Sequence, residues 1–499
     1  MKMSKWAWLL VAAPLLAGCG DFWQAPGSGS TSFTLTNSGN ITVAQGATGT
    51  ATITVSPAST FTGTVTLSCA VTAPTGASNA ATCSLSSTSL TFSSTTAQTS
   101  TLTATTTSST TTGAYQFLVT GTASGSAAET TTVCVEVGTG TCSSTASTSG
   151  NFYILNSSIG SNSTIAGYYI SSGTLNAIGS PVTLNGTAYA VAIAPNGKFL
   201  YVSTSGSSGG VYVYPITSGA LGTGVLVTSD LAYALQVDST NSWLLEAVPY
   251  LSGGGVTLNA VPINSSTGKY TGSTVPTASF TITNASLAQG QMFISPDNSY
   301  IIVALETGGT IVVPFSSSNP LPSSVSATTI AVATAGGSAL SVAIDPSSSP
   351  RLFYIGETLG DTAGTSGGLR AFNYSSLPAK SEISSSRIAS GGLAPTYILP
   401  VVSPSYVYVA NGAGNITGFA VSGNSSSGYT LTTGSTVAAG AQPAGMALDS
   451  TGSYVFEVGS TGSPYFDAYT FDVTTTGQLD SQFTSTSAAT SIAIVAAPK

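Results

Sequence analysis

The side chains of this chain that could carry out chemistry are a few acids and amides and one arginine, most of them placed after short apolar runs. Asn156, Glu357 and Asn411 end such runs at equivalent positions, and Glu306 lies one residue further on. The candidate binding residues are Asn156, Glu306, Glu357, Asp361, Arg370, Asn411 and Glu457. If the runs are strands of one ring, these side chains surround the mouth of its central channel and would bind a polyol, a sugar or a cation.

The same residues allow a hydrolytic interpretation and a structural one. In the first, Glu306 or Glu357 is a general base and Arg370 stabilises a developing oxyanion. In the second, the asparagines and glutamates cap loops or pair with Arg370. Four further carboxylates have a clear structural role, because they occupy turns where a carboxylate accepts backbone N–H groups. These are Asp238, Asp297, Asp345 and Asp449.

The absence of histidine excludes several kinds of site. Without an imidazole there is no Ser-His-Asp or Cys-His arrangement and no histidine-ligated metal. Two GxSxG matches, at residues 206–210 and 364–368, lie in Ser/Gly-rich loops and not at a strand-to-helix turn. The sequence contains no calcium-loop, phosphate-loop or dinucleotide-binding motif. We therefore expect no metal and no cofactor.

The candidate residues belong to a repeated unit, of which residues 190–221 are the clearest copy. An apolar strand is followed by the turn Pro195-Asn196-Gly197, a second strand, and a third strand that ends in a Ser/Gly turn. Seven polar turns of the last kind occur between residues 170 and 479. Repeats of this type predict a seven-bladed β-propeller over residues 151–499. Its first blade lacks an inner strand, so residues 490–497 are expected to supply it and close the ring.

The N-terminal part of the chain is organised differently. Residues 1–18 place two lysines before a short apolar run, as a secretion signal does, and residues 19–31 form a Gly/Ser/Pro tether. Residues 32–137 contain seven Thr- and Val-rich alternating runs, which suit an antiparallel β-sandwich. Residues 138–150 are a linker. The expected fold class is all-β throughout.

Five cysteines indicate disulfides in an exported protein. Cys19 lies at the end of the signal, and the other four allow three pairings. Cys134 and Cys142 flank Gly138 symmetrically, as partners in a hairpin would, which leaves Cys69 for Cys83. We favour these two local bridges. The spacing does not suit a zinc site.

Charged residues make up only 5% of the chain, and this limits its partners. Without Lys2 and Lys5 of the signal, seven basic residues face seventeen acidic ones. Nucleic acid is excluded as a partner, since phosphate binding needs clustered lysine and arginine. No later apolar run approaches the roughly 20 residues that a membrane span needs, so no further span is expected.

Three stretches resemble known families. Leu16-Ala17-Gly18-Cys19 resembles a bacterial lipobox, which implies acylation of Cys19; the alternative is an ordinary signal with an incidental cysteine. In bacterial lipoproteins, an aspartate directly after the acylated cysteine retains the protein in the inner membrane. Here that position is Gly20, which implies an anchor in the outer membrane, facing the periplasm or the surface. Within residues 32–137, the segments FTLT, VAQG and FTGTVTLSC resemble Ig-like modules of exported bacterial proteins, which implies a spacer.

The repeat AIAPNGKFLYVSTS, with VYVYPITSGAL after it, resembles the seven-bladed lactonase family, which includes enzymes that hydrolyse 6-phosphogluconolactone, and the related YVTN surface propellers. The resemblance covers about residues 150–499 and implies a site of histidine, arginine and glutamate around the channel. This chain departs from that pattern because it has no histidine.

Two functions follow as hypotheses. We prefer a noncatalytic cell-envelope propeller that binds a glycan, a small sugar-like ligand or an envelope protein, held to the membrane by its lipid anchor alone. The alternative is a lactonase that acts on a neutral sugar lactone, with the glutamate and arginine roles given above.

Overall fold

The computed structural model describes residues 33–498 with gaps at 39–40, 58–60, 75–76, 95, 125, 127, 139–148, 158–161, 172, 251–253, 441, 462–463, 473–474, 476 and 486–489. The predicted signal, the tether, Cys19, Cys142 and most of the linker lie outside these residues. The chain divides into two compact units, residues 1–143 and 144–499, and the described part of both is almost entirely β. No helix in the described part has the length and apolar character needed to cross a bilayer.

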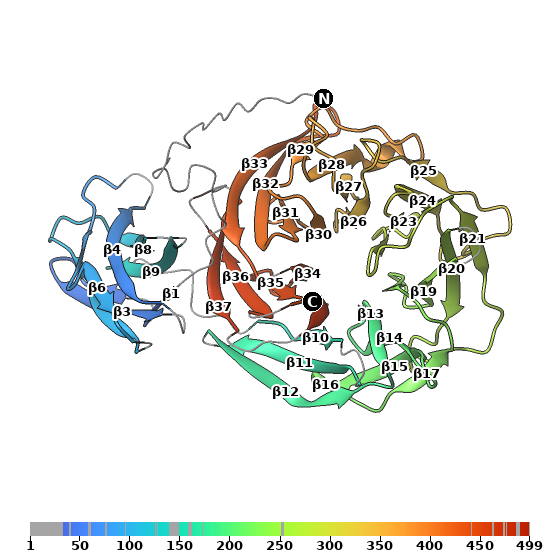
Figure 1. Ribbon diagram of the computed structural model, residues 1–499, viewed down its shortest axis with the longest axis horizontal. Coiled ribbons are helices and arrows are strands. Elements are labelled where there is room, and N and C mark those ends of the chain that lie inside the picture. The colour runs from blue at the N-terminus through green and yellow to red at the C-terminus, as the bar shows by residue number, and fades with distance from the viewer. Residues whose placement is uncertain are drawn as a thin grey trace, which may run out of the picture. The chain divides into compact units, whose positions relative to one another are not determined.

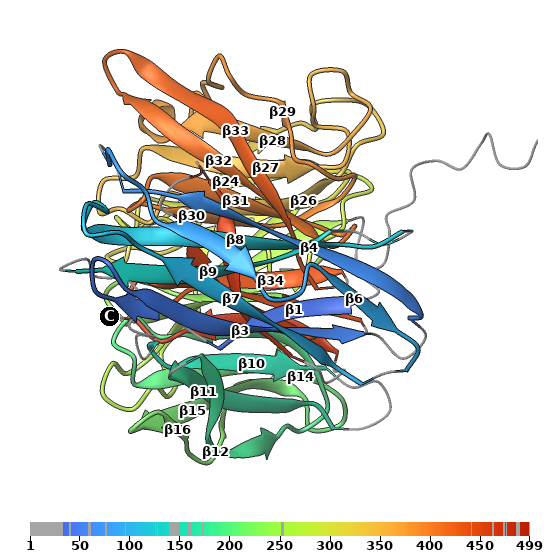
Figure 2. The same cartoon turned by 90° about the vertical axis from the view of Figure 1, so that its left-hand side faces the viewer.

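The N-terminal unit contains nine described strands in two sheets, ordered β1-β3-β7-β5 and β2-β9-β8-β4-β6. The strands are β1 (Phe33–Asn37), β2 (Ile41–Val43), β3 (Thr48–Pro57), β4 (Gly63–Thr72), β5 (Thr82–Leu85), β6 (Ser89–Phe92), β7 (Gln98–Thr105), β8 (Gly113–Thr122) and β9 (Glu129–Val137). Their side chains alternate between buried and exposed, so each sheet has one apolar face. Phe33, Val65, Leu102 and Phe117 bring both sheets into one hydrophobic core. Figure 2 shows these strands.

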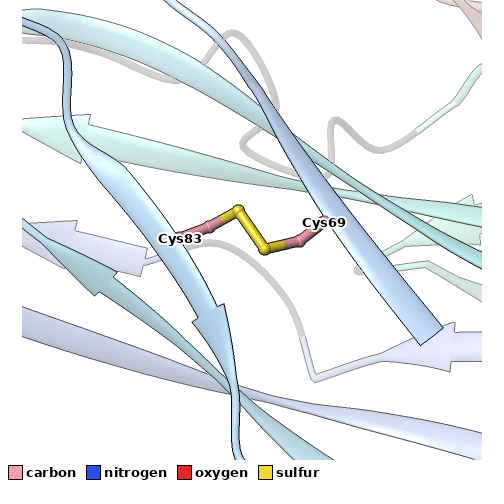
Figure 3. Close-up of a disulfide and its surroundings, with 2 residues drawn as sticks. All are labelled: Cys69 and Cys83. Atoms are coloured by element: carbon pink, nitrogen blue, oxygen red, sulfur yellow. A yellow bond between two sulfur atoms is a disulfide. The ribbon is translucent and has the colours of Figure 1, made fainter. Parts of the chain in front are cut away.

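A disulfide joins the two sheets of this unit (Figure 3). Cys69 on β4 and Cys83 on β5 are bonded, with their Cα atoms 6.4 Å apart. This confirms the pairing predicted for these two cysteines. The second predicted bridge, Cys134 to Cys142, falls outside the described residues because Cys142 does.

The C-terminal unit contains seven antiparallel sheets among its described residues (Figure 1). In chain order we call them sheets 1 to 7. Sheet 1 holds β10 (Phe152–Asn156), β11 (Thr164–Ser171), β12 (Thr174–Thr183) and β38 (Ser491–Ala496). Sheet 2 holds β13 (Thr187–Ile193), β14 (Phe199–Ser205), β15 (Gly210–Thr217), β16 (Ala220–Leu221) and β17 (Val225–Thr228). Sheet 3 holds β18 (Ala234–Val237), β19 (Trp243–Pro249), β20 (Gly255–Pro262) and β21 (Thr277–Thr281).

Sheet 4 holds β22 (Met292–Ile294), β23 (Tyr300–Ala304), β24 (Thr310–Pro314) and β25 (Thr328–Ile330). Sheet 5 holds β26 (Ala339–Ile344), β27 (Leu352–Glu357), β28 (Gly368–Asn373) and β29 (Ile388–Ala389). Sheet 6 holds β30 (Pro395–Val401), β31 (Tyr406–Asn411), β32 (Asn415–Asn424) and β33 (Gly428–Ala438). Sheet 7 holds β34 (Pro443–Leu448), β35 (Tyr454–Gly459), β36 (Phe466–Phe471) and β37 (Leu479–Thr484).

The arrangement of this unit is propeller-like, because each sheet packs its apolar faces against the next. One hydrophobic cluster lies between each pair of consecutive sheets, and another joins sheet 7 to sheet 1. The last of these contains Phe152, whose ring lies 4.1 Å from that of Phe456. Sheet 1 is completed from the far end of the chain, since β38 pairs with β10 in register Ile154↔Ile494. This is the pairing that the sequence predicted for the last strand.

The turns between first and second strands follow the chemistry expected of them. In the repeat that begins at residue 190, Gly197 adopts a φ of 68°, a left-handed conformation that glycine accepts without a Cβ clash. Asp238 accepts hydrogen bonds from the backbone N–H groups of Ser242 and Trp243, both 2.8 Å long. Asp449 does the same for its own turn. The predicted structural role of these turn aspartates is confirmed.

Candidate functional site

In five sheets, the innermost strand carries a β-bulge near its start. The shift lies between Ala188 and Ala190 in β13, and corresponding shifts occur in β26, β30, β34 and β38. Figure 1 shows these first strands nearest the centre of the unit. A bulge leaves one residue unpaired and redirects its side chain, and bulges are common beside binding sites. On each of these inner strands, the bulge therefore leaves one residue without a partner on the adjacent strand.

A cavity of about 660 Å³ lies at the ends of these inner strands. Its walls come from sheets 4, 6, 7 and 1 and include three bulge residues, Thr396, Ala444 and Ile492. The complete lining is Gln289, Gln291, Leu393, Ala394, Thr396, Gly412, Ala413, Gln442, Pro443, Ala444, Ser460 and Ile492. No lining residue carries a charge. Its polar groups are amides and hydroxyls, set among small apolar side chains.

Three glutamines supply most of the hydrogen-bonding capacity of this cavity. Gln289 donates through Nε2 to the carbonyl oxygen of Tyr189 at 2.7 Å, and Gln291 accepts through Oε1 from the N–H of Val342 at 3.2 Å. These bonds fix two of the amides and leave each with further capacity, since a carboxamide has two donors and an acceptor with two lone pairs. The side chain of Gln442 is exposed and makes no hydrogen bond within the described residues.

The rim of the cavity is held in a costly backbone conformation. Gln442 has a φ of 53°, in the left-handed region that residues with a Cβ seldom adopt. The N–H and the hydroxyl of Ser460 both donate to the carbonyl oxygen of Gln442, at 3.0 and 3.1 Å. Strained residues of this kind persist where the surroundings hold them, and they concentrate at binding sites. Leu393, with 68% of its surface exposed, completes the rim with an unpartnered apolar side chain.

A second cavity, of about 460 Å³, lies on the outer strands of sheets 1 and 2. Tyr212 and Tyr214 line it together with Asn185 and a run of residues at 221–224. None of the bulge residues of the inner strands lines it, and the hydroxyl of Tyr212 already donates to the carbonyl oxygen of Ser208 at 2.6 Å. We therefore regard the central cavity as the candidate site.

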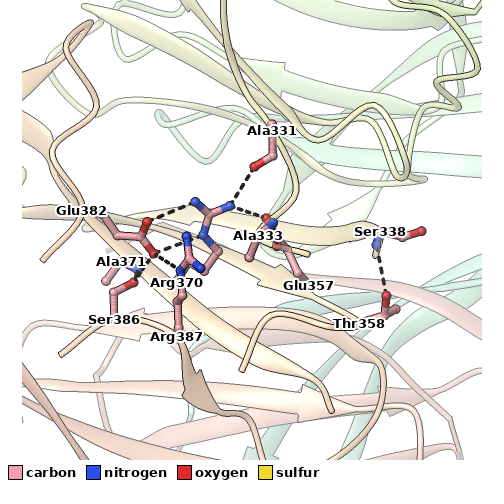
Figure 4. Close-up of polar contacts among 10 residues, drawn as sticks. All are labelled: Ala331, Ala333, Ser338, Glu357, Thr358, Arg370, Ala371, Glu382, Ser386 and Arg387. Atoms are coloured by element: carbon pink, nitrogen blue, oxygen red, sulfur yellow. Dashed lines mark hydrogen bonds and ion pairs between the residues drawn. The ribbon is translucent and has the colours of Figure 1, made fainter. Parts of the chain in front are cut away.

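Glu357 and Arg370, the candidate base and oxyanion partner, form a buried ion pair (Figure 4). Arg370 Nη1 lies 2.7 Å from Glu357 Oε1, and the two side chains are 6% and 1% exposed. The other guanidinium nitrogens donate to both oxygens of Glu382 at 3.1 Å. Burial opposes the charge of Arg370, but the hydrogen bonds that it donates to Glu382 and the negative charge of Glu357 outweigh burial and raise the pKa of Arg370. Both residues have their hydrogen-bonding groups turned toward protein.

This ion pair also joins two sheets. Glu357 accepts through Oε2 from the N–H of Ala333 at 2.7 Å, and Arg370 donates to the carbonyl oxygen of Ala331 at 2.9 Å. Both alanines lie just after β25 of sheet 4, whereas the ion pair belongs to sheet 5. The contacts therefore anchor the connection between sheets, and neither charged residue lines the central cavity.

Three other candidates form hydrogen bonds that hold neighbouring segments of the fold. Asn411 is buried and bonds to Ser390 through both its amide oxygen and its amide nitrogen, at 2.8 Å each. Asn156 accepts from the hydroxyl of Ser491 at 2.6 Å, which ties β10 to β38. Asp361 accepts from the N–H groups of Thr365 and Ser366, and these hydrogen bonds, that of Ser366 first, lower its pKa. None of the three lines the cavity.

The last two candidates differ from each other in exposure. Glu306 is half-buried with a φ of 45°, and its carboxylate makes no hydrogen bond or ion pair within the described part of the chain. Glu457 is fully buried on β35 and faces Asp467 on β36. Neither belongs to the lining of the cavity. Of the two candidate bases, Glu306 and Glu357, only Glu306 has a carboxylate without a protein partner within the described residues.

Sequence reasoning missed the residues that do line the cavity and two buried acids. Gln289, Gln291 and Gln442 are amides in loops and strand starts, and nothing in their spacing distinguishes them from surface residues. Glu246 on β19 and Asp467 on β36 do carry a signal. Each is an acid inside an otherwise apolar run, LLEAV and YFDAY, and such a residue is buried only with a partner or as the neutral acid.

Comparison with known proteins gives a likeness of fold. No protein-family model matches the chain, and no curated protein sequence matches it. A solved structure described as a "putative 6-phosphogluconolactonase" from Bacteroides uniformis aligns with a TM-score of 0.52 at 17% identity, covering 70% of this chain and 99% of that one. At this identity the likeness concerns the fold alone.

Two further solved structures align less well. Hydrazine synthase of Kuenenia stuttgartiensis has a TM-score of 0.41 at 14% identity and covers 63% of this chain and 93% of that one. Sqt1 of Saccharomyces cerevisiae has a TM-score of 0.43 at 12% identity, with coverages of 67% and 85%. Likenesses of this size have no bearing on function.

Proposed function

We propose that the protein is an exported cell-envelope lipoprotein whose C-terminal unit is a closed seven-bladed β-propeller that binds a neutral, hydroxyl-rich ligand such as a glycan segment, without catalysis. The N-terminal unit would be an Ig-like spacer and Cys19 the lipid anchor at the outer membrane. The observation that supports binding is the uncharged lining of the central cavity, with three carboxamides among small apolar side chains.

The chemistry of the lining favours this class of ligand. Carboxamides both donate and accept, as hydroxyl groups do, so they suit sugars better than they suit ions. A phosphorylated ligand would need arginine or lysine at the cavity, and the lining contains neither. The exposed Leu393 would pack against the apolar face of a sugar ring.

The Ig-like proposal for the N-terminal unit has its own support. Two sheets share one core and are joined by the Cys69–Cys83 bridge. The hydroxyl of Tyr115, near the start of β8, donates to the carbonyl oxygen of Thr111 at 2.7 Å. A tyrosine that bonds to the backbone a few residues upstream is a recurring feature of Ig-like sandwiches.

Binding can be tested with the soluble chain lacking residues 1–19, by screening neutral oligosaccharides and measuring affinity for any that bind by calorimetry. Gln442→Ala should weaken binding about fivefold, as expected for the loss of a hydrogen bond worth roughly 1 kcal/mol. Gln482→Ala is the matched control, because Gln482 is an exposed glutamine on β37 away from the cavity lining. No binding by any neutral saccharide, or an equal loss in both variants, would contradict the proposal.

The alternative function, a lactonase that acts on a sugar lactone, is favoured by the likeness of fold to the Bacteroides uniformis protein. It requires an available carboxylate, and Glu306 is the candidate that has one. We would measure hydrolysis of neutral and phosphorylated sugar lactones by the wild type and by Glu306→Gln. Turnover that the variant loses would establish the hydrolytic function and displace the binding proposal.

A further inference from the structure

Two acidic side chains face each other in the interior of sheet 7. Glu457 on β35 and Asp467 on β36 occupy paired positions of the antiparallel ladder. Their exposed fractions are 0% and 3%. Opposite residues on one face of such a pair lie about 5 Å apart at Cβ, close enough for carboxyl groups to touch.

The two carboxyl groups meet beside Gly440, in the connection before β34. The N–H of Gly440 donates to Glu457 Oε2 at 3.2 Å. A Cβ atom added to Gly440 would lie 3.1 Å from that oxygen, 3.5 Å from Asp467 Oδ2 and 2.9 Å from the carbonyl oxygen of Pro464. The absence of a side chain at Gly440 therefore leaves room for three oxygens to converge. Glu457 Oε1 is buried and has no hydrogen-bond partner in the described structure.

Within the described residues, no positive side chain forms an ion pair with either carboxylate. The sequence contains no lysine or arginine between Arg387 and Lys499, so sheets 6 and 7 have none of their own. The contrast with sheet 5 is direct, since the buried Glu357 there has Arg370 at 2.7 Å.

The groups that surround the pair are neutral or acidic. On β36, Tyr469 donates its hydroxyl to the carbonyl oxygen of Ala438 at 3.0 Å. On β37, Thr484 pairs with Asp467 and Asp480 lies four residues earlier. On the neighbouring sheet 6, the titratable groups are Tyr397 on β30 and Tyr406 and Tyr408 on β31, and the strands β34 and β38 contain none. Nothing in this set can neutralise a carboxylate.

Two adjacent carboxylates cannot both stay ionised in such a place, because burial removes their hydration and each repels the other. We infer that Glu457 and Asp467 hold a proton between them in the folded protein and act as a pH-sensitive latch between β35, β36 and the Gly440 connection. A shared proton converts one carboxylate into a donor and supplies the hydrogen bond that Glu457 lacks. Loss of that proton places two repelling charges in the interior of sheet 7.

The electrostatics agree with this geometry. Burial first, and then the Asp467 carboxylate, raise the pKa of Glu457 well above its ordinary value. Burial raises the pKa of Asp467 to about 6. A raised pKa in the folded state means that the stabilisation is complete below the unfolded-state pKa values, 4.5 for the glutamate and 3.8 for the aspartate, and is lost as the pH rises through the folded-state values.

The latch adjoins the rim of the central cavity. Gly440 lies two residues before Gln442, and Glu457 lies three residues before Ser460. Gln442 and Ser460 both line the cavity, and the N–H of Ser460 donates to the carbonyl oxygen of Gln442. An opened latch would loosen this part of the rim. The consequence for ligand binding rests on the proposed function, whereas the latch itself does not.

The test follows the latch without any ligand. We would record thermal unfolding of the chain lacking residues 1–19 between about pH 5 and about pH 8, together with hydrogen exchange of residues 442–448 corrected for the intrinsic pH effect. For the wild type we expect a falling midpoint and faster exchange at the higher pH. Glu457→Gln, which supplies a permanent donor, should reduce the fall in the midpoint and flatten the exchange of residues 442–448. Glu306→Gln is the matched control and should leave both unchanged.

Three results would overturn the inference. One is an equal pH dependence in the wild type and in Glu457→Gln. Another is the absence, in a Glu129→Gln/Glu246→Gln background that removes the other glutamates of raised pKa, of the infrared band of a protonated carboxylic acid at neutral pH, a measurement that also serves if Glu457→Gln and Asp467→Asn fail to fold. The third is stabilisation of the wild type by calcium at the higher pH that Glu457→Gln abolishes, since the occupant would then be a metal cation. None of these results depends on whether a glycan binds.

Discussion

Replacing Glu357 by glutamine should destabilise the protein, and the size of the effect follows from the contacts of Arg370. The substitution removes the charge that lies 2.7 Å from Nη1 of a guanidinium only 6% exposed. Breaking a buried ion pair by removing one partner costs about 3–5 kcal/mol, because the remaining charge stays buried. Arg370 keeps Glu382 and the carbonyl oxygen of Ala331, so we expect the lower end, about 3 kcal/mol. At roughly 2 °C per kcal/mol for a unit of this size, Tm falls by roughly 6 °C.

Thermal unfolding followed by tryptophan emission and by calorimetry is the assay. Trp243, on β19, is the tryptophan of this unit, and its indole N–H donates to the carbonyl oxygen of Ser317 at 2.8 Å, so its emission should report loss of native packing. The double variant Glu357→Gln/Arg370→Met should recover part of the loss, since an apolar replacement leaves no unpaired charge. Glu306→Gln should stay within about 0.5 kcal/mol of the wild type, as surface substitutions do.

The reasoning would be refuted if Glu357→Gln unfolded at the wild-type temperature. The ion pair would then not support the fold, and Glu357 would again be a candidate base. A variant that loses stability and also loses an activity would not identify Glu357 as catalytic, because the connection between sheets 4 and 5 depends on it. For this reason Glu306→Gln is the sharper variant for the lactonase alternative.

Three further predictions concern the pH dependence, the disulfide and the last strand. Burial raises the pKa of Glu246 to about 8, so the stability that its neutral form provides should decline between about pH 5 and about pH 8. Glu246→Gln should remove this contribution to the pH dependence of the unfolding free energy. An equal pH dependence of the wild type and the variant in denaturant titrations would contradict this. Cys69→Ser/Cys83→Ser should lower the stability of the N-terminal unit by about 3 kcal/mol, the value expected for a loop of this length, and a reductant should then have no further effect at this bridge. A chain that ends at residue 490 lacks β38 and exposes the edge of β10, and should elute as oligomers in size-exclusion chromatography; a stable monomer would show that the pairing is dispensable.

Much of the fold could be predicted from the sequence, because the interactions that specify it are local and repeated. Alternating apolar residues and the turn Pro195-Asn196-Gly197 mark strands and reversals, and the carboxylate of Asp238 caps its own turn wherever the sheet lies. The missing first strand near residue 152 similarly pointed to residues 490–497, since an unpaired edge needs a partner. The Cys69–Cys83 bridge is favoured among three possible pairings because the symmetric placement of Cys134 and Cys142 about Gly138 leaves these two cysteines for each other.

The candidate site could not be predicted in the same way, because it depends on distant segments. Glu357 and Arg370 look like a base and its oxyanion partner in the sequence, but sheet register places them on neighbouring strands and turns them toward each other. The cavity gathers side chains from four sheets, and some of them reach it only because a bulge interrupts the ladder.

The sequence alone therefore determined the strands, their turns and the order in which they pair, since hydrogen-bonding pattern and side-chain alternation are properties of short segments. Only the tertiary structure decided which polar groups are neutralised, which stay available and which are buried without a cation. Glu357, Glu306 and Glu457 are the same residue type in similar local sequences. They differ because one meets an arginine, one meets solvent and one meets another acid, and the free energy of a charge depends on those distant neighbours and not on its own segment.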